Sequence, residues 1–188
     1  MAAASNAVDG QAAFEGWAAP GPGAASNASG VGAGTVGGVA SVHFRAGVVI
    51  VVRRTDTGEV LAFERADTPG AWQLPQGGLH DGETPLQAAW RELSEETGLA
   101  EGDVEFVEEH PEWLVYEWPL ELRRAKGGIH RRVGQVQRWF IYHARRPDIM
   151  ATPDGREFVA WQWVAPQWLI DNVAPWRRNP YQIVLGHW

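Results

Sequence analysis

The sequence predicts an α+β fold, and three observations carry this prediction. Several short runs are rich in β-branched and aromatic residues and are bounded by turn-forming residues, as strands are. One helix, from about Thr84 to Thr97, carries signals at both of its ends. Two weaker helices are expected after Pro166 and Pro180, because proline is common in the first turn of a helix.

The strands are expected in this order. The runs 46–52 and 60–63 lie on either side of Asp56-Thr57-Gly58, which is typical of a tight turn, so they predict a hairpin. Three further strands are predicted at 104–107, 136–142 and 158–164.

The first 40 residues differ in composition from the rest of the chain. They contain 13 Ala and 9 Gly and no Lys or Arg, so they cannot bury enough apolar area to offset the entropy of ordering them. We therefore predict a disordered Ala/Gly-rich extension over 1–40 and one domain over 41–188. The sequence shows no signal peptide, transit peptide or membrane span, and we expect a cytoplasmic protein that does not contact membranes.

The overall composition excludes several classes of protein. The 16 Lys and Arg against 23 Asp and Glu give a net charge of −7, which argues against a protein that coats long nucleic acids. The absence of Cys excludes disulfides, thiolate metal sites and Cys nucleophiles. The 11 Trp suit either a core or a surface that stacks on planar ligands such as bases.

The central helix is well defined by the sequence. Residues 84–87 (Thr-Pro-Leu-Gln) form a capping-box pattern with proline at the first helical position, and Gly98 stands where a left-handed residue ends a helix. At about 100° per residue, Glu92, Glu95 and Glu96 share one face beside the apolar stripe.

This acidic face has two interpretations. The ordinary one is a solvated surface, as on most helices. However, like charges three or four residues apart destabilise a helix by about 0.2–0.5 kcal/mol per pair, and only Arg91 is adjacent to relieve them. Clustered carboxylates without His or Cys suit a hard divalent ion, Mg²⁺ or Mn²⁺, that bridges to substrate phosphates. The pattern therefore favours phosphate chemistry.

The residues before and within this helix resemble the Nudix box. Gly77 is followed by five residues and Glu83, and then, after seven more, by the run RELSEETGL at 91–99, so every defining position is filled. The resemblance implies a Nudix α/β/α sandwich with a mixed β-sheet and a loop-helix-loop catalytic motif. It also implies metal-dependent hydrolysis of a nucleoside diphosphate that is linked to a further group.

The resemblance also implies roles within the box. Glu92, Glu95 and Glu96 are expected to bind Mg²⁺, or Mn²⁺ in its place, and one of them to position the attacking water. Gly77 marks the loop entry at this metal site, and Arg91 orients a catalytic glutamate through an ion pair. Which glutamate is the general base is left open.

Segments outside the box resemble the branch of RNA pyrophosphohydrolases and asymmetric dinucleoside tetraphosphate hydrolases. In this branch a carboxylate on a late strand is an additional metal ligand or base, and Glu157 matches it; the alternative is an ordinary surface glutamate. The matching segments are 44–48, 72–78, 113–119, 134–140 and 157–158 with Trp161 and Trp163.

A basic stretch and several single residues are candidates for substrate binding. The segment from Arg123 to Arg146 holds eight Lys and Arg and no Asp or Glu. It is either a solvated loop or a cradle for a polyphosphate or an RNA backbone. The candidate substrate-binding residues are Arg45, Arg65, Tyr116, Gln135, Gln137, Arg138 and Tyr181.

Two functions from different classes fit these features. The first is a hydrolase of phosphoanhydride bonds that acts on RNA 5′-triphosphates or on diadenosine tetraphosphate and has no obligate protein partner. The second is a catalytically silent Nudix domain that senses a nucleotide or binds a partner, which would normally show a damaged box. Because the box is intact, we expect the enzyme.

Overall fold

The computed structural model describes residues 43–124 and 132–188, so the extension predicted for 1–40 lies outside the described residues. Within them, the strands are β1 (His43–Arg53), β2 (Val60–Arg65), β3 (Trp72–Gln73), β4 (Gln76–Gly78), β5 (Val104–Glu109), β6 (Leu114–Glu117), β7 (Arg132–Ala144) and β8 (Phe158–Val164). The helices are α1 (Pro85–Thr97), α2 (Leu120–Arg124), α3 (Pro166–Asn172) and α4 (Arg178–Leu185), with a 3₁₀ turn, η2 (Pro175–Arg177).

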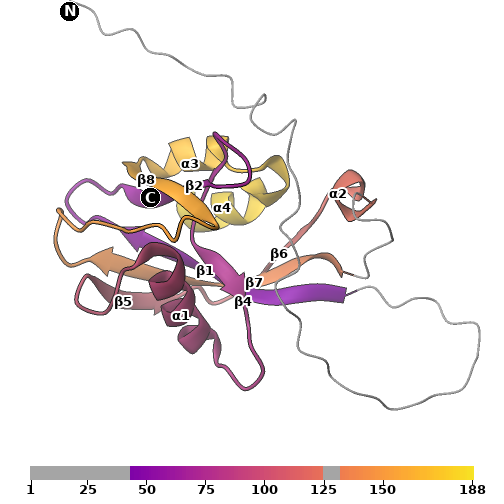
Figure 1. Ribbon diagram of the computed structural model, residues 1–188, viewed down its shortest axis with the longest axis horizontal. Helices are drawn as coiled ribbons and strands as arrows, with labels where there is room; N and C mark the ends of the chain where they lie inside the picture. The colour runs from indigo at the N-terminus through magenta and orange to yellow at the C-terminus, as the bar shows by residue number, and fades with distance from the viewer. Residues whose placement is uncertain (1–42, 125–131) are drawn as a thin grey trace, which may run out of the picture.

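Strand β1 is the centre of one mixed sheet (Figure 1). It runs parallel to β7 over its whole length and antiparallel to β4 and β2 on its other edge. Strand β8 pairs with β2, while β5 and β6 pair with β7. The predicted hairpin pairs next to its turn, where Arg53 of β1 lies opposite Val60 of β2. Farther from the turn, at residues 47–49, β1 pairs with β4 instead.

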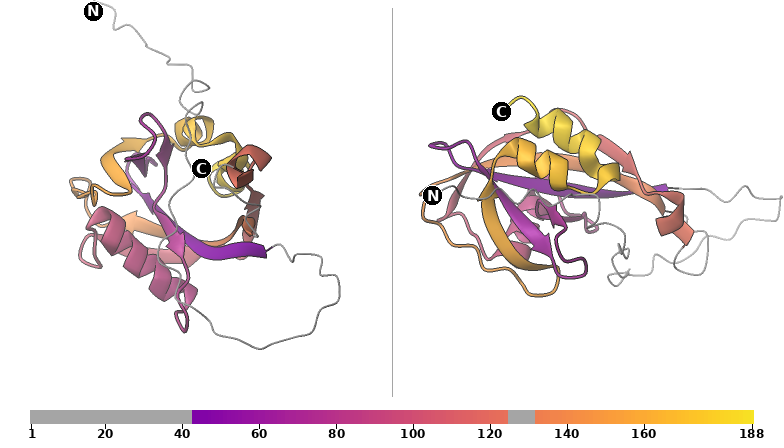
Figure 2. Two further views of the ribbon diagram at one scale, coloured as in Figure 1. Left: turned by 45° about the vertical axis from the view of Figure 1, so that its right-hand side comes forward. Right: turned by 90° about the horizontal axis from the view of Figure 1, so that it is seen from above.

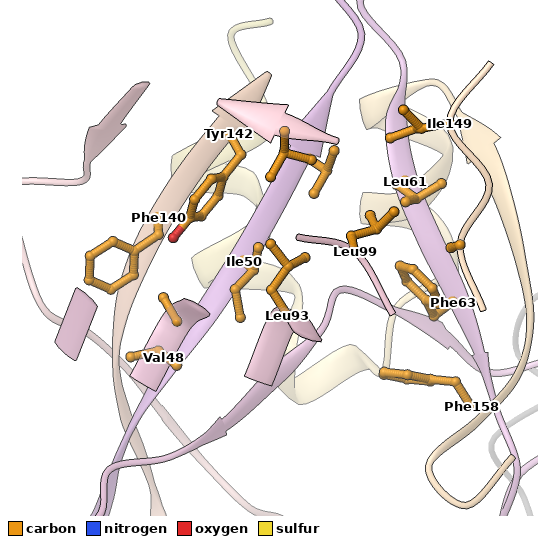
Figure 3. Packing of buried hydrophobic residues seen from close by; sticks show 14 of the residues in the cluster. Val48, Ile50, Leu61, Phe63, Leu93, Leu99, Phe140, Tyr142, Ile149 and Phe158 are labelled. Atoms are coloured by element: carbon orange, nitrogen blue, oxygen red, sulfur yellow. The ribbon is translucent and has the colours of Figure 1, made fainter. Parts of the chain in front are cut away.

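Helices cover both faces of the sheet (Figures 1 and 2). Successive residues of a strand point to opposite faces. Val48 and Ile50 of β1 therefore pack with Leu93 of α1, as Figure 3 shows, whereas Val49 and Val51 belong to the core under α3 and α4. This arrangement confirms the predicted α/β/α sandwich.

The elements with the strongest sequence signals match their predicted ranges. The structure confirms β8 at 158–164, and it confirms α1 with Thr84 as its N-cap. Helix α4 begins at Arg178, slightly before the expected start. The elements β3, β4, β6 and α2 were not predicted, because two to five residues are too few to show a periodicity. No helix of the described ranges is long and apolar enough to cross a membrane.

Candidate active site

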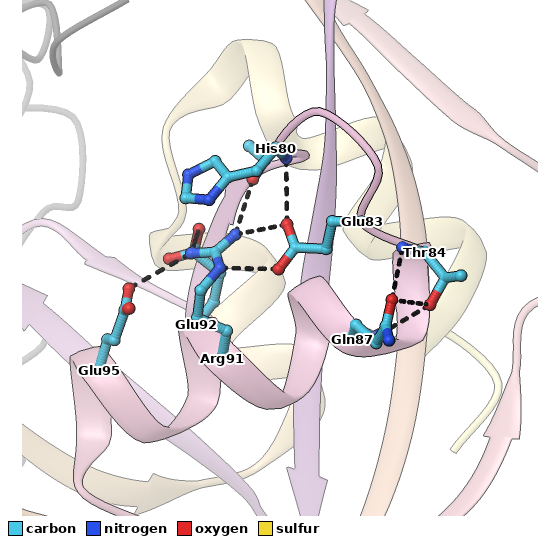
Figure 4. Close-up of polar contacts among 8 residues, drawn as sticks. His80, Glu83, Thr84, Gln87, Arg91, Glu92 and Glu95 are labelled. Carbon is cyan, nitrogen blue, oxygen red and sulfur yellow. Dashed lines mark hydrogen bonds and ion pairs between the residues drawn. The ribbon is translucent and has the colours of Figure 1, made fainter. Parts of the chain in front are cut away.

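The acidic helix α1 is capped at both of its ends, and Figure 4 shows the hydrogen bonds at its N-terminal end. Thr84 Oγ1 accepts a hydrogen bond from Gln87 N at 3.3 Å, and Thr84 N donates to Gln87 Oε1 at 2.9 Å, which confirms the capping box. Gly98 ends the helix with a left-handed φ of 70°. The helix therefore presents its carboxylates in one fixed orientation.

Glu96 is the most deeply buried glutamate of the box, with 4% of the residue exposed. Its Oε2 accepts a hydrogen bond from Gln76 N at 2.9 Å, which ties the helix to β4. Burial raises the pKa of Glu96 well above its usual value, and the neighbouring carboxylates of Glu157 and Glu92 raise it further. A proton or a cation is therefore favoured at this carboxyl.

Glu92 lies directly against the backbone of Gly77. A Cβ added to Gly77 would overlap the Glu92 carboxylate, so any other residue here would force the Glu92 side chain to shift. The pKa of Glu92 is raised, mainly by burial. Arg91 Nη1 donates to Glu92 Oε1 at 2.7 Å, which offsets part of the cost of burying this charge. The packing gives a physical reason for glycine at the loop entry.

Arg91 connects the helix to the loop that precedes it (Figure 4). It donates to both carboxylate oxygens of Glu83, at 2.8 and 2.9 Å, and to the Gly78 carbonyl at 3.0 Å. The same guanidinium donates to Glu92 and, at 3.3 Å, to the exposed Glu95. Its hydrogen bonds lower the pKa of Glu83. Arg91 therefore holds three carboxylates and the loop in one arrangement.

Glu157 reaches the box from the start of β8. Asp154 Oδ1 accepts a hydrogen bond from Glu157 N at 2.9 Å, and the Glu157 carbonyl accepts one from Ala66 N at 2.8 Å. These bonds fix the backbone at the point where the Glu157 carboxylate raises the pKa of Glu96. The fold thus adds a carboxylate that is distant in sequence to those of α1.

Glu92, Glu96 and Glu157 together form the carboxylate cluster. Burial, and then repulsion within the cluster, raise the pKa values of Glu92 and Glu96, so a divalent cation would be stabilised there. Oxygen ligands without His or Cys suit Mg²⁺ or Mn²⁺. In the part of the chain that the structure describes, no three His, Asp or Glu side chains stand in ready-made coordination geometry. Arg91 engages Glu92 and Glu95 instead. The donor chemistry of the cluster therefore fits a hard cation, while Arg91 binds one carboxylate of the cluster, that of Glu92.

A row of amides lies beside the carboxylate cluster. Gln137 Nε2 donates to Gln135 Oε1 at 2.8 Å and to Gln76 Oε1 at 3.2 Å. Gln76, Gln135 and Gln137 form the amide row. Since Gln76 also donates from its backbone to Glu96, this residue joins the amide row to the carboxylate cluster.

Tyr116 and Arg177 continue from the amide row toward the C-terminal helices. Tyr116 on β6 pairs across the sheet with Gln135 of β7. The Arg177 guanidinium lies 5.4 Å from the centroid of the Tyr116 ring, and its Nη1 donates to Gln73 Oε1 at 2.8 Å. Arg177 and Gln73 were not predicted as site residues, because the hydrogen bond that brings them together joins residues far apart in the chain.

Arg45 and Arg65 also act on Tyr116. Burial raises the pKa of Tyr116, while the positive charges of Arg177, Arg45 and Arg65 oppose that rise. Arg45 is exposed, whereas Arg65 is buried and donates to Asp67 at 2.7 and 2.5 Å. Three cations from β1, β2 and η2 therefore act electrostatically on Tyr116, and Arg177 also lies near its ring.

Two further predicted substrate-binding residues make other contacts. Arg138 follows Gln137 on β7 and so points to the opposite face of the sheet, where it pairs with Glu109. Tyr181 is buried in α4, and its hydroxyl accepts a hydrogen bond from Leu74 N at 2.9 Å. Neither side chain lies against the amide row.

The basic stretch from Arg123 to Arg146 does not form one continuous cradle in the described residues. Arg123 donates to Glu117 at 2.6 Å beside β6, whereas Arg146 donates to Asp103 at 3.3 Å near the start of β5. Residues 125–131, which contribute two of the eight cations, lie outside the described residues. Four arginines of the stretch are paired with acids instead, namely Arg123, Arg138, Arg145 and Arg146.

Comparison with known proteins identifies the family. Residues 43–184 match the family model described as the NUDIX domain. The chain belongs to the Nudix family. This confirms the resemblance on which the sequence prediction was based.

The Nudix chain is similar to several named relatives. It is 40% identical over 144 residues to an RNA pyrophosphohydrolase of Cereibacter sphaeroides, which covers 74% of this chain and 86% of the relative. It is 41% identical over 133 residues to an RNA pyrophosphohydrolase of Roseobacter denitrificans, covering 68% and 81%. Nudix hydrolase 25 of Arabidopsis thaliana is 35% identical over 136 residues, covering 67% and 75%.

Solved structures share the Nudix fold at lower identity. The E. coli dihydroneopterin triphosphate pyrophosphohydrolase superimposes with a TM-score of 0.62 at 23% identity, over 79% of this chain and all of that one. The C. elegans Ap4A hydrolase binary complex gives a TM-score of 0.56 at 22% identity, over 73% and 93%. At this identity the likeness supports the fold alone.

Proposed function

We propose that this Nudix protein is a divalent-metal-dependent RNA 5′-pyrophosphohydrolase. It would cleave an anhydride bond of a 5′-triphosphate end and leave a 5′-monophosphate. The observation that carries the proposal is the link through Gln76, which joins the carboxylate cluster to the amide row. Groups suited to a metal thus stand beside groups suited to a nucleotide. The RNA pyrophosphohydrolases at 40% and 41% identity support the same substrate class.

The carboxylates supply the chemistry of hydrolysis. Mg²⁺ or Mn²⁺ held by Glu92, Glu95, Glu96 and Glu157 would neutralise phosphate charge and lower the pKa of water. One of these glutamates would accept the proton that the attacking water loses. Arg91 keeps Glu92 and Glu95 oriented through its hydrogen bonds.

The groups around the amide row supply binding. Gln76 is half-buried and would offer its amide to the substrate. Gln137 donates to this amide and would orient it, while Gln135 and Tyr116 are buried beside Gln137 and would support it. Arg45 is exposed and carries a charge suited to phosphate oxygens. Because these groups would contact only the first nucleotides of an RNA, the protein's net charge of −7 should have little effect on binding of the RNA 5′ end.

A catalytically silent Nudix domain is the less favoured alternative. A silent domain is expected to lose catalytic carboxylates, whereas here each box glutamate is present and hydrogen-bonded. Diadenosine tetraphosphate remains a second substrate to be tested, because it also presents a polyphosphate between two nucleosides.

A kinetic comparison of three substrates tests the proposal. Purified protein in Mg²⁺ is assayed with triphosphorylated RNA, diadenosine tetraphosphate and ADP-ribose. We expect the highest kcat/KM for RNA, with a 5′-monophosphate end as product. A highest kcat/KM for ADP-ribose would replace the proposal with a diphosphate-sugar hydrolase. No hydrolysis of any of the three would favour the silent domain.

A further inference from the structure

Two side chains near the C-terminus hold the segment that leads into the box. Arg177, at the end of η2, donates from Nη1 to Gln73 Oε1 at 2.8 Å. Tyr181, about one turn later in α4, accepts a hydrogen bond at Oη from Leu74 N at 2.9 Å. Consecutive residues of the segment are therefore held by one side of the C-terminal helical region.

The Leu74 amide lies between strands and takes its partner from Tyr181. Strand β3 ends at Gln73 and β4 begins at Gln76, so Leu74 and Pro75 form the connection between them. Leu74 is fully buried, and a buried amide without a partner is costly. The Tyr181 hydroxyl thus satisfies a donor whose loss would destabilise this connection.

The same connection leads directly to the amide that holds Glu96. Gln76 N donates to Glu96 Oε2 at 2.9 Å. Only Pro75 separates this amide from that of Leu74, and its ring fixes the backbone φ. The Pro75 carbonyl is itself held by Ile50 N at 2.9 Å. Tyr181 Oη and Ile50 N thus hold the two ends of the Leu74–Pro75 connection, and loss of the first bond would leave the Gln76 amide, and with it Glu96, less tightly fixed.

Tyr181 has no exposed surface with which to contact a substrate. The residue is 1% exposed and packs edge-on against Trp139, with ring centroids 5.1 Å apart. Burial raises the pKa of Tyr181 to about 12, so its hydroxyl stays neutral in the physiological range. Its contribution to the site can only pass through the residues that it holds.

We propose that Tyr181 is a positioning residue for the reaction. Its hydroxyl fixes the Leu74 amide and, through the 74–76 segment, the Gln76 amide that orients Glu96. This inference rests on the proposed function, because it assigns Glu96 to the reaction. It replaces the sequence-based expectation that Tyr181 binds substrate.

The first test removes only the hydroxyl. In Tyr181→Phe we expect kcat for triphosphorylated RNA to fall roughly 10- to 100-fold, the loss typical when the partner that orients a metal ligand is removed. KM should change little, because Tyr181 does not contact substrate. Tyr142→Phe is the matched control: Tyr142 is fully buried too, but its hydroxyl has no hydrogen-bond partner among the described residues, so kcat should be unchanged.

Two further readouts separate positioning from a general effect on the fold. Amide hydrogen exchange at Leu74 and Gln76, measured by NMR without substrate or metal, should be faster in Tyr181→Phe than in wild type or Tyr142→Phe. In a Glu96→Gln background, Tyr181→Phe should cause no additional fall in kcat, because the residue on which it acts is already lost.

Each contrary result has a distinct meaning. If the wild type is active and Tyr181→Phe has the same kcat and the same amide exchange rates, the positioning role is overturned and the proposed function is not. An equal fold-loss in the Glu96→Gln background also overturns it, since the effect then does not pass through Glu96. A wild-type protein that hydrolyses no triphosphorylated RNA overturns the proposed function, and with it a role in that reaction.

Discussion

The Nudix box and the amide row are built in different ways. The box occupies one contiguous segment, 77–99, and is held by short-range contacts such as the two hydrogen bonds from Arg91 to Glu83. The amide row combines β4 with β7, and its neighbours come from β1, β2, β6 and η2. Most of the chemistry of the site is therefore encoded locally, with Glu157 added by the fold, whereas its binding side depends on the whole fold. Substitutions should accordingly lower kcat in the box and raise KM around the amide row.

The largest expected effect is at Glu96. Glu96→Gln should reduce kcat for triphosphorylated RNA by roughly 10²- to 10⁴-fold, because it removes a metal ligand and a candidate general base. The fold should remain, since glutamine can still accept the hydrogen bond from Gln76 N. Single-turnover rates and circular dichroism together check this prediction. Near-normal turnover in saturating Mg²⁺ would remove Glu96 from the site.

The next effect concerns the close approach at Gly77. Gly77→Ala should abolish most activity and destabilise the fold by about 1–3 kcal/mol, because the new Cβ would overlap the Glu92 carboxylate. Gly102→Ala is the matched control, since a Cβ there meets open space at an ordinary φ. Turnover and denaturant unfolding of both variants are compared. If the two alanine variants behave alike, the contact between Gly77 and Glu92 is not a constraint.

The binding side should respond through KM instead. Arg45→Gln should raise KM for triphosphorylated RNA roughly tenfold with little change in kcat, because a charge-assisted contact to phosphate is lost. Arg146→Gln serves as the control, because Arg146 is exposed and pairs with Asp103 near the start of β5. Steady-state kinetics at fixed ionic strength distinguish them. A fall in kcat at constant KM in Arg45→Gln would contradict the expected difference between the Nudix box and the amide row.

The smallest expected effect is on stability in the absence of metal. The pKa of Glu96 is raised above its usual 4.5, so the folded chain binds a proton more readily than the unfolded chain. Its contribution to stability therefore falls as pH rises from about 4.5 through the raised pKa. In EDTA at pH 8, the free energy of unfolding should be higher for Glu96→Gln than for wild type. Below about pH 4.5 this difference should disappear. Urea unfolding at both pH values measures this, and a pH-independent difference would contradict it.

Local signals explain what the sequence predicts well. Helix α1 is bounded by Thr84 and Gly98, whose caps need only neighbours within a few residues, and strand β8 matches its predicted range. The glutamates of α1 share a face through helical periodicity alone. Prediction of the box therefore required no knowledge of the rest of the fold.

Long-range contacts explain what the sequence leaves open. The pairs Arg177 with Gln73 and Tyr181 with Leu74 join residues more than 100 positions apart, so no local pattern predicts them. Arg138 is instructive in another way. Arg138 was predicted to bind substrate because it lies in a segment that resembles the family. Since successive residues of a strand point to opposite faces, its side chain lies on the other face of the sheet from Gln137 and the amide row.

Metal dependence tests the central claim most directly, namely that the carboxylate cluster acts by holding a divalent cation. Hydrolysis of triphosphorylated RNA is followed after exhaustive treatment with EDTA and again after Mg²⁺ or Mn²⁺ is added, for wild type and Glu96→Gln. We predict that chelated wild type is inactive, that either ion restores it, and that Glu96→Gln is restored only weakly at the same ion concentration. Full activity of the chelated wild-type protein, or full rescue of Glu96→Gln, would contradict the claim.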